Sequence, residues 1–171
     1  MIILIHDMEK AAFSAAFGDY TDGMRIIDKS LRVRPCIGCS NCWIRTPGVC
    51  PIRDDLSFIA EDLAMTNRLI LVSRCLYGSV SPFVKNVLDR MRGYSTPLLE
   101  IHDDQSRYKL RYPGHFALEM HFYGPASEEE QKIAREFAER LGHSMDVSSL
   151  KLYFSETPEI AAEVLNENRF D

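Results

Sequence analysis

Four cysteines, Cys36, Cys39, Cys42 and Cys50, fall within one short stretch of the 171-residue sequence and form its most reactive segment. Thiolates bind metal ions and iron-sulfur clusters, and a dense cysteine group in a reducing compartment is more often metal-binding or redox-active than a disulfide framework. The first three are separated by two residues each, as in a ferredoxin-type run, and the fourth follows after seven. All four thiolates can therefore converge on one tight loop, and we expect that loop to bind a [4Fe-4S] cluster.

Two other interpretations of the cysteine segment stay open. Zinc also accepts four thiolates, although zinc sites commonly take them from two Cys-x-x-Cys pairs set further apart than here. The thiols can also be vacant and pack as small apolar side chains, because free cysteine is readily buried. Cys75 has no partner in the sequence and follows a buried apolar run, so we interpret it as a packing residue.

The elements that must position these cysteines alternate between strand and helix. Apolar runs without period-two alternation predict strands buried on both faces at 2–5, 69–72, within 116–122 and at 150–154. Helical patterns lie between them: one opened by Asp54 or Asp55, one begun by Ser81-Pro82, one with a Ser127/Glu130 capping box, and a last one after Thr157-Pro158. This order predicts an α/β fold with a doubly wound sheet of about five parallel strands.

The chain has the length of one domain, and its 46% of apolar residues are ample for a single core. We therefore expect one domain over 1–171. The least regular stretch, at about 95–114, is polar, and we interpret it as an insert with a functional or interfacial role.

Charge and the amino-terminal residues exclude several classes of protein. The formal net charge is -5 and the basic residues are scattered, so nothing resembles a footprint for nucleic acid or anionic lipid. Met1 leads into an apolar run and then Asp7 without the basic region of a signal peptide, and no apolar run approaches the ~18 residues of a membrane span. We expect a cytoplasmic protein with no nucleic-acid or membrane partner.

Two segments carry a likeness to a known family. One runs from Pro35 to Trp43 and continues over Cys50 to Leu56, and the other runs from Ser73 to Ser81 and continues through Leu88 to Arg90. Together they resemble the NAD(P)H-dependent FMN reductase superfamily, and most closely its iron-sulfur flavoprotein branch. The resemblance implies a flavodoxin-like three-layer sandwich, with FMN bound at the carboxyl ends of the strands beside the cysteine site.

In this family the loop after the third strand curls round the flavin ring, offering backbone N–H groups and an aromatic side chain for stacking. That loop here predicts flavin-binding residues at Ser73, Arg74, Cys75, Leu76, Tyr77 and Gly78. Tyr77 is the candidate for stacking, although a tyrosine at a strand end is also commonly half-buried packing. Arg74 stands where the family usually has proline and can offset the charge of a reduced flavin or pair with a carboxylate.

The first loop departs from the family pattern. The family has a segment rich in Ser, Gly, Asn and Thr, whose amides hold the FMN phosphate at a helix N-terminus. This chain has His6, Asp7, Met8, Glu9 and Lys10. At an effective dielectric of ~20, a carboxylate about 5 Å from a phosphate would cost roughly 3 kcal/mol, whereas a helix end contributes only ~0.3–1 kcal/mol. Unless Asp7 and Glu9 turn away, repulsion of the phosphate wins.

His121 lies near the end of the predicted fourth strand, at the edge where ligands bind in open α/β sheets. It is a candidate for contact with flavin or substrate, or a hydrogen-bonded structural histidine. Glu119, two residues earlier, suggests an edge strand or a subunit contact.

These observations favour an oxidoreductase, linked to NAD(P)H or ferredoxin, in which FMN and the cluster move electrons to an unknown acceptor. The alternatives are a cluster-free flavin or quinone reductase, and a flavin-less, non-catalytic or metal-binding member, which the acidic first loop favours. The partners would be a small-molecule or protein electron donor and acceptor. The resemblance also implies a homodimer or homotetramer, in which a neighbouring subunit helps to enclose the flavin.

Overall fold

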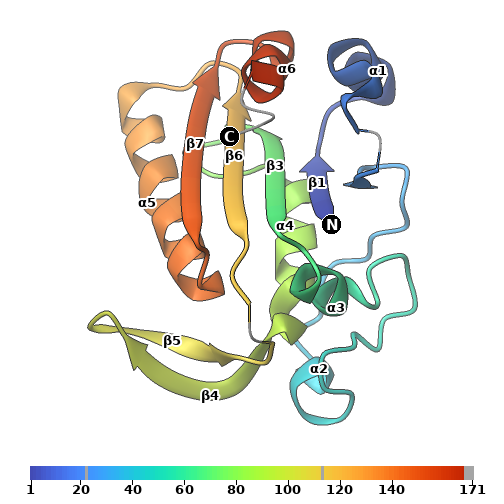
Figure 1. Ribbon diagram of the computed structural model, residues 1–171, viewed down its shortest axis with the longest axis vertical. Helices are drawn as coiled ribbons and strands as arrows, with labels where there is room; N and C mark the ends of the chain where they lie inside the picture. The colour runs from blue at the N-terminus through green and yellow to red at the C-terminus, as the bar shows by residue number, and fades with distance from the viewer. Residues whose placement is uncertain (22, 113, 168–171) are drawn as a thin grey trace.

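A computed structural model describes residues 1–21, 23–112 and 114–167, and its centre is a five-stranded parallel sheet with the strand order β2-β1-β3-β6-β7 (Figure 1). The sheet strands are β1 (Ile2–His6), β2 (Arg25–Ile27), β3 (Arg68–Arg74), β6 (Ala117–Tyr123) and β7 (Ser149–Ser155). The helices are α1 (Lys10–Phe17), α2 (Asn41–Ile44), α3 (Ile59–Ala64), α4 (Pro82–Arg90), α5 (Glu128–Met145) and α6 (Pro158–Glu167). This order is the flavodoxin-like arrangement, and it confirms the predicted fold class.

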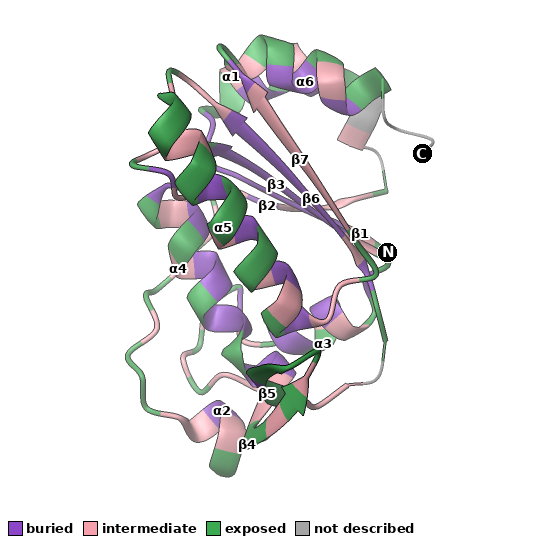
Figure 2. Cartoon of the chain, turned by 90° about the vertical axis from the view of Figure 1, so that its left-hand side faces the viewer, coloured by how far each residue is buried: buried purple, intermediate pink, exposed green. Residues whose placement is uncertain are grey.

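Helices cover both faces of the sheet, as buried parallel strands require. Figure 2 shows α3, α4 and α5 on one face and α1 and α6 on the other. The larger core lies on the first face, where Leu71 and Phe122 of the sheet pack with Leu63 and Val84. The smaller core joins Leu4, Ile70 and Val72 to Phe13 and Phe17 of α1 and to Ala162 and Leu165 of α6.

Local signals set the starts of α4 and α5. The Ser81 hydroxyl accepts the N–H of Val84 at 3.5 Å, with Pro82 at the first helical position. Ser127 and Glu130 form the predicted capping box. The part of the chain that the structure describes contains no helix both long and apolar enough to cross a membrane.

Two segments differ from the predicted pattern. The stretch expected to be irregular at 95–114 contains an antiparallel hairpin, β4 (Ser95–His102) with β5 (Gln105–Leu110), preceded by a 3₁₀ turn at Met91–Tyr94. The helix expected to open at Asp54 or Asp55 begins only at Ile59. Both aspartates instead accept backbone N–H groups of the preceding segment, from Arg34 and Arg32.

The two ends of the sheet carry different features. All five strands run in the same direction, so the residues after β1, β3 and β6 gather at one end, together with α1 and α6 (Figure 1). The short helix α2 and the β4–β5 hairpin lie at the opposite end of the molecule (Figure 1). The predicted ring loop and the predicted cysteine site therefore occupy opposite ends of the molecule, and the prediction that the cysteine site lies beside the flavin crevice of the same chain is wrong.

Candidate functional site

The cysteine segment bends sharply around α2. Cys36 and Cys39 precede the helix, Cys42 lies within it and Cys50 follows it. Left-handed backbone at Gly38, Ser40 and Gly48 turns the chain on both sides of the helix. The Gly48 N–H donates to the Cys42 carbonyl at 2.9 Å, which returns the chain towards Cys50.

The Cys42 thiol lies within electrostatic reach of the other three. Burial raises the pKa of the Cys42 thiol, and negative charge on Cys50, Cys36 and Cys39 would raise it further. All five cysteines of the chain are free. Among the described residues, no group of three or more His, Cys, Asp and Glu side chains is placed to hold a metal ion. Convergence of all four sulfurs on one ion or cluster therefore stays a prediction.

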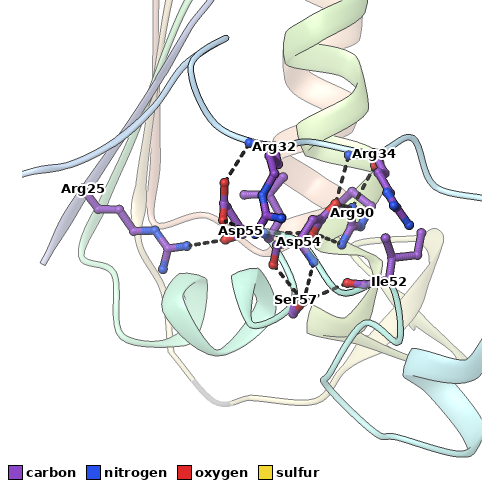
Figure 3. A network of polar contacts seen from close by, with 9 residues as sticks. Arg25, Arg32, Arg34, Ile52, Asp54, Asp55, Ser57 and Arg90 are labelled. Atoms are coloured by element: carbon purple, nitrogen blue, oxygen red, sulfur yellow. Dashed lines mark hydrogen bonds and ion pairs between the residues drawn. The ribbon is translucent and has the colours of Figure 1, made fainter.

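A buried ion pair anchors the cysteine segment to the core (Figure 3). Asp54 and Arg90 meet through two hydrogen bonds of 2.6 and 2.8 Å, and their side chains are only 2% and 0% exposed. Arg90 also donates to the Arg34 carbonyl at 2.8 Å. Burial opposes ionisation of Asp54, but the bonds from Arg90 and from the N–H groups of Arg34 and Leu56 hold its pKa below the usual value. The two segments that carry the family likeness thus meet at this pair.

The Nε–H of Arg90 indicates which kind of group the cysteine segment can bind. The Nε–H is buried and has no hydrogen-bond partner in the part of the chain that the structure describes. The Cys50 sulfur lies beside the guanidinium, and together with Asp54 it raises the pKa of Arg90 despite burial. A thiolate or a cluster sulfur is an anionic acceptor, so the donor set fits an anionic sulfur centre at Cys50.

Trp43 joins the cysteine segment to its surroundings. Its indole N–H donates to the Arg92 carbonyl at 2.8 Å, and the Arg92 guanidinium lies 3.8 Å from its ring centre. Tyr108 of the hairpin packs against the same ring at 4.9 Å. These contacts assign Trp43 to holding α2 against the 3₁₀ turn Met91–Tyr94 and the hairpin.

The ring loop at the other end of the sheet is a tight turn with Tyr77 at its tip. Leu76 and Ser79 exchange two backbone hydrogen bonds of 2.9 Å, and Tyr77 and Gly78 between them have positive φ angles of 52° and 75°. A Cβ at Gly78 would meet the Ile133 side chain at 2.5 Å, so the turn is pressed against α5. Tyr77 is 87% exposed. A non-glycine residue in this conformation is strained, and its ring is free to stack on a ligand.

Most other groups of the ring loop serve the fold. Ser73 is buried and accepts the Ser81 N–H at 2.8 Å. The N–H groups of Cys75 and Leu76 donate to the Tyr123 and Ser79 carbonyls. The Cys75 side chain lies in the larger core, where burial raises the pKa of its thiol. These loop N–H groups are therefore not available to flavin carbonyls, and the Cys75 side chain acts as packing.

Asp7 of the first loop turns into the protein and is only 6% exposed. Its carboxylate accepts the Arg74 N–H at 3.0 Å, the Ser73 hydroxyl at 3.2 Å and the Tyr123 hydroxyl at 2.8 Å. Burial and this carboxylate raise the pKa of Tyr123, which stays a donor. Glu9 points outward and pairs with Lys29 at 3.1 Å. Sequence reasoning missed Tyr123 as a partner because it lies 116 residues from Asp7.

The first loop does not fit an FMN phosphate. Its inward-facing polar side chains are the His6 ring and the Asp7 carboxylate, and Asp7 already takes the Ser73, Arg74 and Tyr123 donors. The backbone amides that begin α1 are the remaining donors, and Glu9 at the cap makes no side-chain capping bond. The exposed Tyr77 ring thus suits the flavin ring of FMN. The first loop, which in the family would hold the phosphate, does not suit the phosphate of FMN.

His6 lies directly before Asp7 and is fully buried. Its ring stacks on Phe13 with 3.7 Å between ring centres and 2° between planes. Burial lowers the pKa of His6 to about 4, although Asp28 at 3.8 Å favours the charged form. His6 is therefore neutral at pH 7 and belongs to the small core beneath α1.

His121 and Glu119 are internal, and the predicted edge-strand explanation of Glu119 is wrong. Strand β6 lies between β3 and β7. Glu119 accepts from Arg68 Nε at 2.9 Å and contacts His121 Nε2 at 2.6 Å, while His121 stacks on Tyr153. His121 is 1% exposed, so it presents no surface to a ligand at the carboxyl edge. Burial opposes ionisation of Glu119, but His121 and Arg68 lower its pKa.

One curated relative is an iron-sulfur flavoprotein of Methanocaldococcus jannaschii, 37% identical over 75 residues. The match covers 44% of this chain and spans 37% of that protein's length. No protein-family model matches the chain.

Solved structures of similar fold cover nearly the whole chain. An NAD(P)H:quinone oxidoreductase from Methanothermobacter marburgensis has a TM-score of 0.58 at 13% identity, over 98% of this chain and 94% of that one. An FMN-dependent NADH-azoreductase from Bacillus anthracis, in complex with FMN, has a TM-score of 0.54 at 7% identity, over 98% and 94%. At these identities the likeness establishes the flavodoxin-like fold alone.

The buried ion pair predicts a large effect on stability. Asp54→Ala leaves the Arg90 charge buried and unpaired, so the free energy of unfolding should fall by about 3–5 kcal/mol. Urea unfolding measures this loss. Asp89→Ala is the matched control, because Asp89 is on α4, exposed and paired with Lys85, and it should cost about 0.5 kcal/mol or less. Equal losses for the two variants would contradict the assignment of Asp54–Arg90 as the anchor.

His6 predicts a pH dependence of stability. Its pKa is about 4 in the folded chain and 6.5 when unfolded, so only the unfolded chain takes up the proton between these values. Stability should therefore fall as the pH drops through this window, by about 2 kcal/mol between pH 7.5 and 5. His6→Phe keeps a ring against Phe13 and should lack this component. Urea unfolding at several pH values tests the difference, and parallel pH curves for the two proteins would refute it.

Proposed function

We propose that this chain, which has the flavodoxin-like fold of the NAD(P)H-dependent FMN reductases and is similar in sequence to an iron-sulfur flavoprotein, is a redox protein with two centres. One is a flavin ring at the Ser73–Gly78 loop, and the other is a [4Fe-4S] cluster at Cys36, Cys39, Cys42 and Cys50. The observation that carries the proposal is the cysteine segment, which the Asp54–Arg90 pair fastens to the core beside Cys50. Electrons would come from a nicotinamide or protein donor and leave to a small-molecule or protein acceptor.

The chain's own residues would bind and shield these groups. A bound flavin and cluster supply the hydride and electron chemistry that no side chain here supplies. Tyr77 would cover one face of the flavin ring, and Arg90 would place a hydrogen-bond donor and its positive charge beside a cluster ligand. The FMN-dependent azoreductase of similar fold supports FMN as the flavin. The first loop opposes its phosphate.

The separation of the two sites bears on the oligomer. Strand β3 alone, with seven residues, spans about 20 Å between the two ends of the sheet. An electron path from flavin to cluster is shorter if a neighbouring copy brings its cysteine segment to this chain's ring loop, which favours a homodimer or homotetramer. Exposed apolar side chains at the cysteine end suit such a contact, namely Ile37, Ile44, Leu98, Leu99 and Ile101.

A second candidate function is a flavin-less metal-binding protein. The inward-turned Asp7 favours it, because the phosphate position is filled by the chain itself. Anaerobic purification followed by a visible spectrum and iron, zinc and sulfide assays separates the two. Flavin or iron supports the redox protein, zinc without flavin supports the second function, and the absence of all three would argue against both.

The cluster assignment predicts the metal content of variants. Anaerobic reconstitution of the wild type should give about four iron and four sulfide per chain. Cys42→Ser should lose most of both, because Cys42 is a proposed ligand and its thiol is close enough to the other three cysteines for their charges to act on it. Cys75→Ser should retain them, since Cys75 lies in the core near the other end of the sheet. Equal uptake by both variants, or none by the wild type, would remove the cluster from the proposal.

Tyr77 predicts a change in flavin affinity. Tyr77→Ala should weaken riboflavin binding by about 3- to 10-fold, the amount expected for one stacked aromatic pair of ~0.5–1.5 kcal/mol. Quenching of flavin fluorescence measures the affinity. Tyr108→Ala removes another exposed tyrosine at the opposite end and should leave affinity unchanged. Unchanged affinity in Tyr77→Ala would exclude Tyr77 as the stacking residue.

A further inference from the structure

We infer that the carboxyl-end site of this chain selects against phosphorylated ligands and takes an uncharged planar ring, with riboflavin favoured over FMN. This inference rests on the proposed function, because it names the form of flavin that the site accepts. It starts from Asp7, a charged residue that lies at the centre of the predicted ligand edge.

Asp7 follows β1 at the point where the strand order reverses. Strands β2 and β3 lie on opposite sides of β1, and ligands of open α/β sheets bind outside the carboxyl ends at such a point. The side chain bridges the ends of β3 and β6, through Ser73, Arg74 and Tyr123. All three contacts are donations to the carboxylate. The donors at this position therefore bind an anion, and that anion is the Asp7 carboxylate of the chain itself.

The surrounding charges are balanced without a ligand. Glu9 and Asp28 add negative charge near Asp7, and the positive charges are those of Lys10, Lys29 and Arg74. Lys29 is already paired with Glu9. A phosphate brought to the start of α1 would add up to two negative charges to this balanced set of three acidic and three basic side chains. An uncharged ring adds none.

The neighbouring groove also favours an uncharged ligand over a phosphate. A groove of about 620 Å³ lies between the turn after β6, the start of α5 and the end of β7. Its lining contains the carboxylates of Glu130 and Glu156 and, among the described residues, no basic side chain. Glu130 also accepts the Tyr77 N–H, so the backbone of the Tyr77 turn lies next to this groove. The two carboxylates of the groove disfavour a phosphate, and the exposed Tyr77 side chain of the adjoining turn suits a neutral planar ligand.

Fluorescence titrations of riboflavin and FMN with the full chain test the inference. The wild type should bind riboflavin about 10- to 100-fold more tightly than FMN at low salt, and this ratio should shrink at high salt as the repulsion is screened. Asp7→Asn should bring the ratio to within about 3-fold, because it removes the charge and keeps an acceptor for Tyr123. Glu9→Gln removes the exposed carboxylate two residues away and should leave most of the ratio in place.

The outcomes separate this inference from the proposed function. Wild-type protein that binds FMN as tightly as riboflavin overturns the phosphate discrimination and leaves a flavin protein standing. A riboflavin preference that Asp7→Asn does not reduce overturns the role of Asp7. Binding of neither flavin overturns both. The wild-type comparison needs no variant, so it decides the question even if Asp7→Asn fails to fold.

Discussion

The buried pair of Asp54 and Arg90 is the interaction on which the arrangement of the cysteine end depends. Two charges removed from water are tolerated only when their hydrogen bonds are satisfied, and here the Arg34 backbone and the Leu56 N–H complete most of them. The pair fixes the chain on both sides of the cysteines, because Arg34 precedes Cys36 and Asp54 follows Cys50. A segment with little regular structure is thereby held against α4.

At the carboxyl end of the sheet, a different polar side chain, that of Asp7, holds the strand ends together. Asp7 closes the edge between β1, β3 and β6 from within, where related folds leave room for ligands. The chain therefore keeps the architecture of a nucleotide-binding sheet while changing the electrostatics of its crevice. The exposed Tyr77 and the acidic groove beside it remain open to solvent. The same fold can thus present a crevice of different charge, because fold alone does not fix the ligand.

Features set by neighbouring residues were predictable from the sequence, and features set by distant partners were not. The capping box of Ser127 and Glu130 is local, and the apolar runs of β1 and β3 needed no partner to be identified. Asp7 was interpreted as a charge facing a ligand because its donors lie 66 to 116 residues away. Glu119 resembled an edge residue because Arg68, its partner across the sheet, is 51 residues distant. The β4–β5 hairpin was hidden by its polar composition, since it buries little of its own surface.

The turn at Tyr77 has a consequence for how the protein would change under selection. A tyrosine with φ of 52° carries conformational energy of about 1–3 kcal/mol that a glycine there would not. Selection for heat resistance alone would therefore replace this tyrosine. Related chains that keep a tyrosine here would be those in which binding of a ligand by its ring matters more than stability to heat. Related chains with glycine here would be those that no longer need the ring.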